Sequence, residues 1–471
     1  MINHKNILVD GKWIESTGIG TLAVINPVTE ATIAHVPRGS AEDVDRAVQA
    51  AARALPQWAQ SSIDERIALF ERLAQLTEAR GEEITHTVVS ELGYPVAWAA
   101  KSQTAGAVEE LDIIAKSLRQ IAWAELIGTT RIGREPAGVV GAITAWNAPL
   151  RSIISKAGAA IAAGCTVVCK PSEVAPLTGY IFAELMTEAG FPPGVFNLVC
   201  GTGPEVGEAI ASHALVDMVS LTGSVRAGRR VMELASASIK RVHLELGGKS
   251  ANVILPDADF ERAVNDGIAD ALRNAGQVCG GLTRMLVPRE LLAQAEELAT
   301  VKAASYVLGD PFDPATTLGP VSTQAARERV RGYIQSGVED GARMLAGGAE
   351  PPEGLSRGWF VKPTVFSGNN SNRIAREEIF GPVVVIIPFA DEADAVNIAN
   401  DSQYGLAGGV WSGDPQRARA VAAKLRVGRI RINGAPIDKH GTHGGFKLSG
   451  IGREWGRVGI EEFLEYKTVI G

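Results

Sequence analysis

The apolar positions before residue 120 recur at helical spacing. A first predicted helix begins at Ser40, where Ser40-Ala41-Glu42-Asp43 forms a capping-box variant, and its apolar residues share one face: Val44, Ala47, Val48, Ala51 and Leu55. A second amphipathic helix carries Ile67, Phe70, Leu73 and Leu76. Ahead of both, Asp10-Gly11 predicts a hairpin turn. We expect these elements to be scaffold.

From Gly138 the pattern changes to short apolar runs that alternate with helical segments. The runs cover residues 139–145, 166–169, 196–200, 218–222 and 242–246. Strands separated by helices are typical of a parallel, doubly wound sheet with both faces covered. Ligands of such a sheet bind at the carboxyl ends of its strands.

After Gly248 the alternation restarts. Its strand candidates are residues 251–255, 284–287, 383–388, 409–411 and 428–433. The pattern therefore predicts an α/β protein with a doubly wound parallel-sheet domain and a second α/β domain. We expect the cleft between the two domains to hold cofactor and substrate.

Composition and charge argue against several classes of partner and site. The formal net charge is −7 with no long run of either sign, which argues against nucleic acid. The apolar stretch 157–169 is too short to cross a bilayer, and the N-terminus has no apolar signal core, so we expect a soluble cytoplasmic protein. The four cysteines show no Cys-x-x-Cys pairing, and His440 and His443 alone do not close a tetrahedral site. Neither a disulfide nor a metal is indicated.

Cys279 is the candidate nucleophile. A free thiol with a pKa of ~8.5 is only about 3% ionised at pH 7, although the thiolate is the form that attacks a carbonyl. Gly276, Gly280 and Gly281 keep bulk away from Cys279 and allow a substrate to approach. A small apolar core residue is the usual interpretation of a lone cysteine, and it suits the three others, Cys165, Cys169 and Cys200.

Asn147 and Glu245 stand at predicted strand ends. Asn147 precedes Pro149, which is favoured in the first turn of a helix, so its amide can lie beside a helix N-terminus. Glu245 shares a strand face with His243 and emerges beside Gly247-Gly248. The alternatives are an ordinary helix cap for Asn147 and a solvated strand residue for Glu245.

Five separated motifs, among them Trp146-Asn147-Ala148-Pro149, Glu245-Leu246-Gly247-Gly248 and Asn274-Ala275-Gly276-Gln277-Val278-Cys279, resemble the aldehyde dehydrogenase superfamily. They occur in the family's order, from about Asp10-Gly11 to Tyr466-Lys467-Thr468-Val469. The resemblance implies the NAD(P)-dependent, hydrolytic oxidation of an aldehyde to a carboxylic acid. Cys279 would form the thiohemiacetal and thioester, Asn147 and the Cys279 N–H would stabilise the oxyanion, and Glu245 would activate water.

The resemblance also implies supporting residues and domains. Lys156 would support the oxyanion site and Glu454 would relay protons, with a surface ion pair as the alternative for Glu454. The expected NAD-binding domain is 1–117 and 137–247, the catalytic domain is 248–447, and the oligomerisation segment is 118–136 and 458–471. We expect a homodimer or homotetramer.

For the cofactor, two Gly-rich turns compete, one from Gly201 to Gly207 and one at Thr222-Gly223-Ser224. Ser224 opens a helix whose N-terminus favours a phosphate, so the second turn is the expected diphosphate contact. Glu173 would repel a 2′-phosphate, which favours NAD over NADP, although NADP stays possible. The implied cofactor residues are Ala145, Trp146, Lys170, Ser172, Glu173, Gly203, Gly207, Thr222, Gly223, Ser224, Leu246, Gly247, Glu378 and Phe380.

The expected substrate pocket departs from the family. Small residues occupy positions where relatives often carry bulky ones, and His443 stands where the family usually reads Pro-Phe-Gly-Gly. The predicted pocket residues are Ala148, Arg151, Ser152, Ser155, Arg273, Val278, Gly280 and His443. They favour a bulky cyclic, aromatic or terpenoid aldehyde that can bear a polar or anionic end. For His443, a neutral loop histidine is the alternative to a place near the tunnel mouth.

Three rival functions stay open. A semialdehyde dehydrogenase acting on an anionic aldehyde is one, although Ser155 stands where such relatives carry arginine. The second is a non-catalytic NAD-binding or structural protein of the same fold. The third is a cysteine hydrolase that needs no cofactor.

Overall fold

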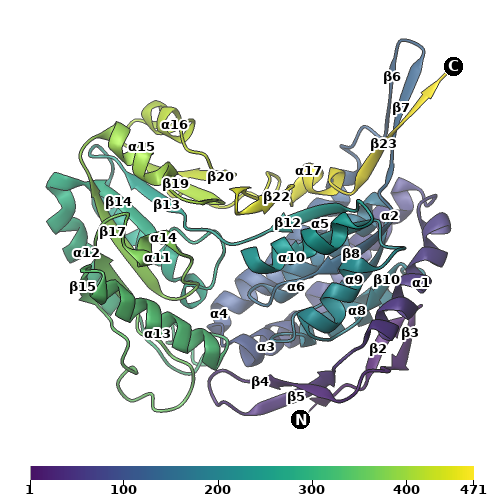
Figure 1. Ribbon diagram of the computed structural model, residues 1–471, viewed down its shortest axis with the longest axis horizontal. Helices are drawn as coiled ribbons and strands as arrows, with labels where there is room; N and C mark the ends of the chain where they lie inside the picture. Colours follow the sequence, from purple (N-terminus) through teal and green to yellow (C-terminus); the bar gives the residue numbers. More distant parts are fainter. Residues whose placement is uncertain (1) are drawn as a thin grey trace.

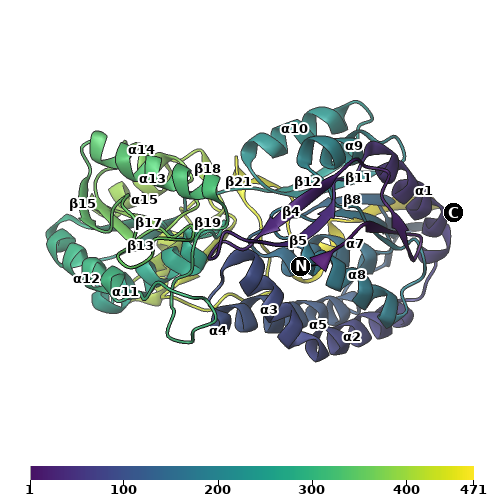
Figure 2. The same cartoon turned by 90° about the horizontal axis from the view of Figure 1, so that it is seen from below.

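The computed structural model describes residues 2–471 and contains two large sheets that lie side by side (Figures 1 and 2). Five parallel strands form the centre of the first sheet, in the order β12-β11-β8-β9-β10. They are β8 (Val139–Ile143), β9 (Thr166–Lys170), β10 (Phe196–Leu198), β11 (Met218–Thr222) and β12 (Arg241–Glu245). The predicted strands are thus confirmed, with boundaries shifted by one or two residues.

Antiparallel strands extend this sheet at both edges. The two-residue strand β22 (Gly450–Ile451) pairs with the end of β12. At the other edge, β10 pairs with β2 (Asn6–Val9), which forms a hairpin with β3 (Lys12–Glu15). Asp10 and Gly11 have φ values of 54° and 69°, as a tight hairpin turn requires, so the predicted hairpin is confirmed.

Helices cover both faces of the first sheet. Ser40 caps α1 (Ala41–Trp58) in a capping box with Asp43, as predicted. With α9 (Glu208–Ser212) and α10 (Val225–Ser236), α1 buries one face. Packing against the other face are α2 (Ile63–Ala79), α5 (Gly106–Leu118), α6 (Pro149–Ile153), α7 (Ala159–Ala163) and α8 (Leu177–Ala189). Strands covered on both faces explain the continuous apolar runs in the sequence.

The second sheet has seven strands in the order β15-β16-β17-β14-β13-β19-β20, and all are parallel except the edge strand β15. They are β13 (Ala251–Ile254), β14 (Arg284–Pro288), β15 (Arg343–Ala346), β16 (Thr364–Ser367), β17 (Val383–Phe389), β19 (Ala407–Trp411) and β20 (Arg429–Ile432). One face packs on α11 (Phe260–Leu272) and α12 (Leu292–Ala304). The other face packs on α13 (Gln324–Glu339), α14 (Arg373–Arg376), α15 (Glu392–Asn400) and α16 (Pro415–Ala422).

A small sheet projects from the body beyond α17 (Gly456–Glu461) (Figure 1). Its order is β23-β7-β6, from β6 (Ala124–Ile127), β7 (Thr130–Pro136) and β23 (Leu464–Ile470). It unites the two segments, 118–136 and 458–471, that fit neither large sheet in the sequence. Leu126 and Ile127 are 72% and 61% exposed.

The remaining elements are short or peripheral. A three-stranded sheet consists of β1 (Ile2–Asn3), β5 (Thr32–Pro37) and β4 (Thr21–Ile25), and β18 (Tyr404–Gly405) pairs with β21 (Phe446–Lys447). The helices α3 (Gly81–Leu92) and α4 (Val96–Ala99) lie between α2 and α5 in the chain. Over residues 2–471, none of the helices has the length and apolar character that crossing a bilayer requires.

Candidate active site

The carboxyl ends of the first sheet's strands carry many of the predicted site residues. Ala145, Trp146 and Asn147 follow β8, Lys170 ends β9, and Glu245 ends β12. After β8 the chain first adds strands on one side, β9 and β10, and then on the other, β11 and β12. This reversal creates the switch point at which doubly wound sheets bind ligands.

Asn147 lies where the sequence placed it, one residue before the cap of α6, which has Pro149 at its first position. Its Nδ2 donates a 3.0 Å hydrogen bond to the carbonyl of Gln277, two residues before Cys279. The hydroxyl of Tyr94 donates to the carbonyl of Asn147. An amide NH₂ has two hydrogens, so Asn147 keeps a second N–H donor beside the loop that bears Cys279.

The loop that leads to Cys279, residues 274–279, has a strained backbone conformation. Asn274, Ala275 and Gly276 have φ values of 49°, 52° and 72°, in the left-handed region. A Cβ on Gly276 would lie 2.0 Å from the carbonyl oxygen of Gly381, so only glycine fits there. Buried Gln277 fastens the loop, donating to the Asn274 carbonyl and accepting from the Ser322 N–H.

Cys279 differs from the other cysteines in its exposure. Cys165, Cys169 and Cys200 are at most 1% exposed and belong to the core, as predicted, whereas Cys279 is partly exposed. Burial of the sulfur and the neighbouring Glu245 carboxylate raise the pKa of the Cys279 thiol well above its usual value, and Arg429 opposes the shift. A thiolate here needs a compensating hydrogen bond.

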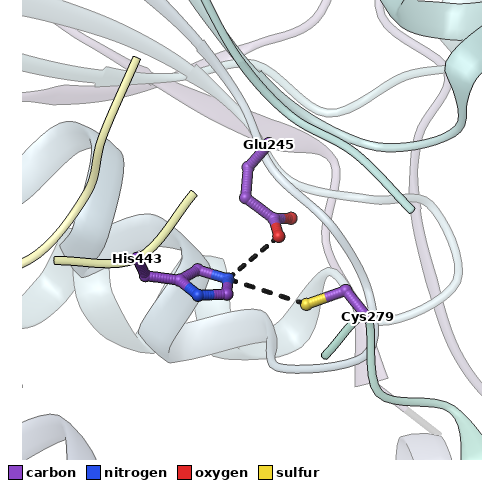
Figure 3. Close-up of side chains that lie close together, drawn as sticks. All are labelled: Glu245, Cys279 and His443. Carbon is purple, nitrogen blue, oxygen red and sulfur yellow. Dashed lines mark hydrogen bonds and ion pairs between the residues drawn. The ribbon is translucent and has the colours of Figure 1, made fainter. Parts of the chain in front are cut away.

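Figure 3 shows His443 lying between Glu245 and Cys279. Its Nε2 is 2.9 Å from Oε1 of Glu245 and 3.8 Å from Sγ of Cys279. One ligand-type atom from each of the three side chains lies within 4.8 Å of the others. His443 is 5% exposed, so this loop residue is buried against both groups, and its role stays a prediction.

Lys156 and Glu454 form a buried ion pair. Lys156 lies on a π-helical turn, Ile154–Gly158, and its Nζ is 2.6 Å from Oε1 of Glu454. Lys156 is fully buried and Glu454 is 6% exposed, so the surface-pair alternative for Glu454 is wrong. Lys156 also donates to Ser220, whose hydroxyl contacts His243. The backbone of Glu454 pairs with that of His443, which links this pair to the nucleophile.

The predicted cofactor residues of the first sheet lie in the region at the carboxyl ends of its strands. Nζ of Lys170 is 3.1 Å from Oε2 of Glu173, and Ser224 caps α10 through the Ala227 N–H. A Cβ on Gly203 would meet nothing within 4 Å, and Gly203 and Gly207 bound a second π-helical turn, Gly203–Gly207. A groove of about 520 Å³ runs beside α10, lined by Val225, Arg226, Arg229, Gln403, Tyr404 and Leu448 among others.

Further predicted cofactor residues face this region from the second sheet. Glu378 accepts a hydrogen bond from the Gly248 N–H, and burial raises the pKa of its carboxyl to about 7. A Cβ on Gly247 would lie 2.0 Å from Glu378, so this close approach requires glycine. Phe380 packs edge-on against Trp146, with ring centroids 5.5 Å apart. Nζ of Lys249 is buried and has no hydrogen-bond partner among the described residues.

Several predicted pocket residues already make hydrogen bonds or ion pairs with other residues of the protein. The Ser155 hydroxyl donates to buried Glu110, which also pairs with Arg151 at 3.3 Å, and the Ser152 hydroxyl accepts from the Ala145 N–H. Arg273 pairs with Asp270 at 2.9 Å. These contacts give the pocket wall fixed charges but few free donors. The roles of Ala148 and Val278, which are partly exposed near Asn147 and Cys279, stay predictions.

The sequence interpretation missed Arg429, the first residue of β20. A Cβ on Gly280 would lie 3.2 Å from Nη2 of Arg429, and its guanidinium lies 5.2 Å from the Trp455 ring centroid. Nε and Nη1 of Arg429 are buried and make no hydrogen bond within residues 2–471. A signal was present, because Arg429 and Arg431 alternate with Ile430 and Ile432 in a predicted buried strand.

Comparison with known proteins decides the family. The model of the "Aldehyde dehydrogenase family" matches residues 13–469. The chain belongs to the aldehyde dehydrogenase family. It is 47% identical to a 3-succinoylsemialdehyde-pyridine dehydrogenase of Pseudomonas sp over 473 aligned positions, covering 100% of this chain and 99% of that protein. The expected α/β aldehyde dehydrogenase fold and enzyme class are thereby confirmed.

Solved structures of aldehyde dehydrogenases superimpose closely. One is a cysteine-to-alanine mutant of aldehyde dehydrogenase C from Pseudomonas syringae with NAD⁺ and octanal, with a TM-score of 0.98, 45% identity and coverage of 99% of this chain and 96% of that one. Another is an aldehyde dehydrogenase from Mycobacterium tuberculosis with NAD⁺, with a TM-score of 0.97, 38% identity and coverage of 100% and 98%.

Proposed function

We propose that this aldehyde dehydrogenase oxidises a bulky aromatic or cyclic aldehyde to its carboxylic acid, with NAD as the hydride acceptor. The observation that carries the proposal is the meeting of Cys279, Glu245 and His443 within 4.8 Å, with the Asn147 amide bonded to the same loop as the nucleophile. Retention of both a nucleophile and a base argues against a non-catalytic member of the fold.

The residues present fit NAD. The capped N-terminus of α10 at Ser224 suits a diphosphate, and Lys170 and Glu173 offer a donor and acceptors for ribose hydroxyls. Open space at Gly203 leaves room for a flat base. The carboxylate of Glu173 disfavours a 2′-phosphate and hence NADP. Two of the similar structures named above contain NAD⁺. When bound, NAD supplies the acceptor for the hydride that leaves the substrate carbon.

The protein's own groups carry the other steps. The Cys279 sulfur forms a bond with the aldehyde carbon, and the developing oxyanion accepts from the second Asn147 N–H and the Cys279 backbone N–H. Glu245 first accepts the proton of the Cys279 thiol and releases it to solvent, and after the oxidation its carboxylate takes a proton from a water that attacks the thioester. The carbon–sulfur bond then breaks and the acid leaves. The buried Lys156–Glu454 pair holds the helix behind Asn147 and provides a route for the proton.

Groups near Cys279 support this substrate class. Arg429, whose guanidinium borders Gly280, lies over the Trp455 ring, so aromatic and cationic groups lie together beside the nucleophile. Because Nε and Nη1 of Arg429 are buried without partners, the substrate's far end should carry a hydrogen-bond acceptor. A ring that bears a carbonyl satisfies both requirements, and the name of the Pseudomonas relative joins a semialdehyde to a pyridine.

A second candidate is an aldehyde with a carboxylate at its far end. The same unpaired Arg429 favours it, because a guanidinium binds a carboxylate through paired hydrogen bonds. Paired series of aromatic aldehydes, with a ketone or a carboxylate at the far end, separate the two candidates by their kcat/KM.

We further propose that the NAD-binding domain comprises 1–117 and 137–247 and the catalytic domain 248–447. The projecting sheet would then join subunits into a homodimer or homotetramer. Supporting this role, β6 and β23 are outer strands with free edges and exposed apolar residues. Light scattering of the wild type and of a Leu126→Asp/Ile127→Asp variant tests the assembly, which should dissociate in the variant.

The deciding experiment is an aldehyde panel scored by NADH formation, with Cys279→Ala as control. We expect NADH with aromatic aldehydes and none with the variant. Ester cleavage that proceeds equally with and without NAD, together with no NADH from any aldehyde, would instead identify a cysteine hydrolase.

A further inference from the structure

His443 makes contacts that an aromatic apolar residue at the same position could not make. Its Nε2 lies 2.9 Å from the Glu245 carboxylate and 3.8 Å from the Cys279 sulfur (Figure 3). Its other nitrogen, Nδ1, is buried and has no partner within the described residues.

The contacts place a hydrogen on Nε2 of His443. An ionised carboxylate only accepts hydrogen bonds, so the Nε2–H donates to the Glu245 carboxylate. The ring is fixed in place, since it stacks on Trp455 with centroids 4.6 Å apart and its backbone pairs with that of Glu454.

A thiolate at Cys279 faces an electrostatic obstacle. Burial and the Glu245 carboxylate both raise the pKa of the thiol, because two anions would lie close together in a site with little water. The obstacle disappears if the carboxylate takes up the thiol proton, since the single negative charge then moves from oxygen to sulfur. The new thiolate still needs a donor, and the Nε2–H is the nearest one.

We propose that His443 is a positioning residue that holds Glu245 beside the thiol and transfers its Nε2 hydrogen bond to the sulfur as the thiol proton passes to Glu245. The S–H bond breaks and an O–H bond forms on the carboxylate. His443 neither gains nor loses a proton, and the net charge of the three groups is unchanged. This proposal rests on Cys279 being the nucleophile of the proposed function.

Charged groups on the neighbouring elements also affect the proton transfer from Cys279 to Glu245. Arg429 at the start of β20 favours the thiolate, and Glu378, before β17, disfavours it. Behind His443, Arg453 and Lys156 act on buried His243, whose pKa is lowered by burial and by these cations. None of these groups contacts Sγ through a hydrogen bond in the described structure, so the Nε2–H is the local donor that a variant can remove.

The test measures how fast iodoacetamide alkylates Cys279 as a function of pH, without NAD or aldehyde, by mass spectrometry of the Cys279 peptide. The variants are His443→Phe, which keeps the stacking on Trp455, and His443→Gln, whose amide can replace the Nε2–H. We expect His443→Phe to shift the alkylation profile upward by about one pH unit, which slows the reaction at neutral pH about tenfold, and the rates to converge at high pH. His443→Gln should restore most of the wild-type profile.

His440→Phe is the matched control, because His440 lies in the same loop, is exposed and pairs only with Asp438. Its profile should equal that of the wild type. The proposal is overturned if His443→Phe alkylates like the wild type across the pH range while remaining folded by circular dichroism, or if His443→Gln is as slow as His443→Phe. Since the assay needs no turnover, a failure of the proposed oxidation would show separately, as wild-type protein that is alkylated normally but forms no NADH.

Discussion

The two large sheets contribute to the site through opposite ends of their strands. The first sheet presents the carboxyl ends of its parallel strands, from which Asn147, Lys170 and Glu245 emerge. The second presents the segments before its amino ends, since Cys279 precedes β14, Phe380 precedes β17 and Arg429 begins β20. In the proposed function, strand ends of the first sheet therefore supply the oxyanion donor and the base, whereas loops of the second sheet supply the nucleophile and the substrate contacts.

The difference shows in how each group is held. Glu245 is the last residue of a paired strand, with β11 on one side and β22 on the other, so the ladder itself fixes its position. Cys279 has no such ladder and depends on three left-handed residues and the buried Gln277 side chain. Rigid strands thus position the base, and a strained loop positions the group that must reach the substrate.

Replacing the nucleophile should have the largest effect. Cys279→Ala removes the atom that forms the thioester, so kcat/KM for NADH formation should fall at least about 10⁴-fold. Steady-state absorbance measures it. Cys200→Ala is the control, since Cys200 is a buried core residue of the first half, and its activity should persist. Substantial NADH formation by Cys279→Ala would show that Cys279 is not the nucleophile and that the second sheet does not supply it.

Replacing the base should separate the two halves of the reaction. Glu245→Gln should lower kcat by about 10²–10⁴-fold, because the thioester still forms from the fraction of thiol that ionises to solvent but is then hydrolysed slowly. A burst of one NADH per site and an acylated Cys279 peptide in the mass spectrum are the expected signs. Exposed Glu339→Gln should behave as the wild type. A slow reaction with no burst and no acylated peptide would show that Glu245 acts only in the steps before the hydride leaves.

Arg429 tests whether the second sheet also selects the substrate. Arg429→Met should lower kcat/KM about 10–100-fold for aromatic aldehydes with an acceptor at the far end, because a hydrogen bond to a charged group is lost. Benzaldehyde, which has no such acceptor, should lose less, because only the support that Arg429 gives to the Cys279 thiolate is removed. Exposed Arg426→Met in the same segment is the control. Equal losses for both substrates would show that Arg429 supports the fold and does not recognise the far end.

Glu378 lies where the two sheets meet, and its effect should be the smallest. Because burial raises its pKa to about 7, it is protonated at lower pH and becomes a carboxylate as pH rises through about 7. A carboxylate accepts hydrogen bonds from ribose hydroxyls more strongly, so KM for NAD should fall about fivefold over that range. Glu378→Gln should flatten the profile. An equally steep profile in the variant would assign the titration to another group.

Much of this arrangement could be predicted from the sequence. Continuous apolar runs revealed the five central strands, because strands buried on both faces have little room for polar residues. The positions of Asn147, Glu245 and Ser224 followed, since each lies directly at the end of a predicted element. The capping residue Ser40 and the Asp10-Gly11 turn were local signals of the same kind.

The rest depends on contacts between distant segments. His443 and Glu454 lie in a Gly-rich stretch with no hydrophobic period, and only the pairing of β22 with β12 brings them into the interior. Arg429 was overlooked because a charged residue at a strand start usually points to solvent. The left-handed run from Asn274 to Gly276 could not be predicted either, since residues other than glycine adopt this conformation rarely and alanine most rarely of the three.

The short pairing of β22 with β12 has a consequence for biosynthesis. The strand that bears Glu245 receives its outer neighbour from residues 450–451, and the imidazole that touches both Glu245 and Cys279 lies 198 and 164 positions further along the chain than they do. The reactive sulfur therefore has its full surroundings only after residues 443–451 have been synthesised, long after Cys279 itself has left the ribosome.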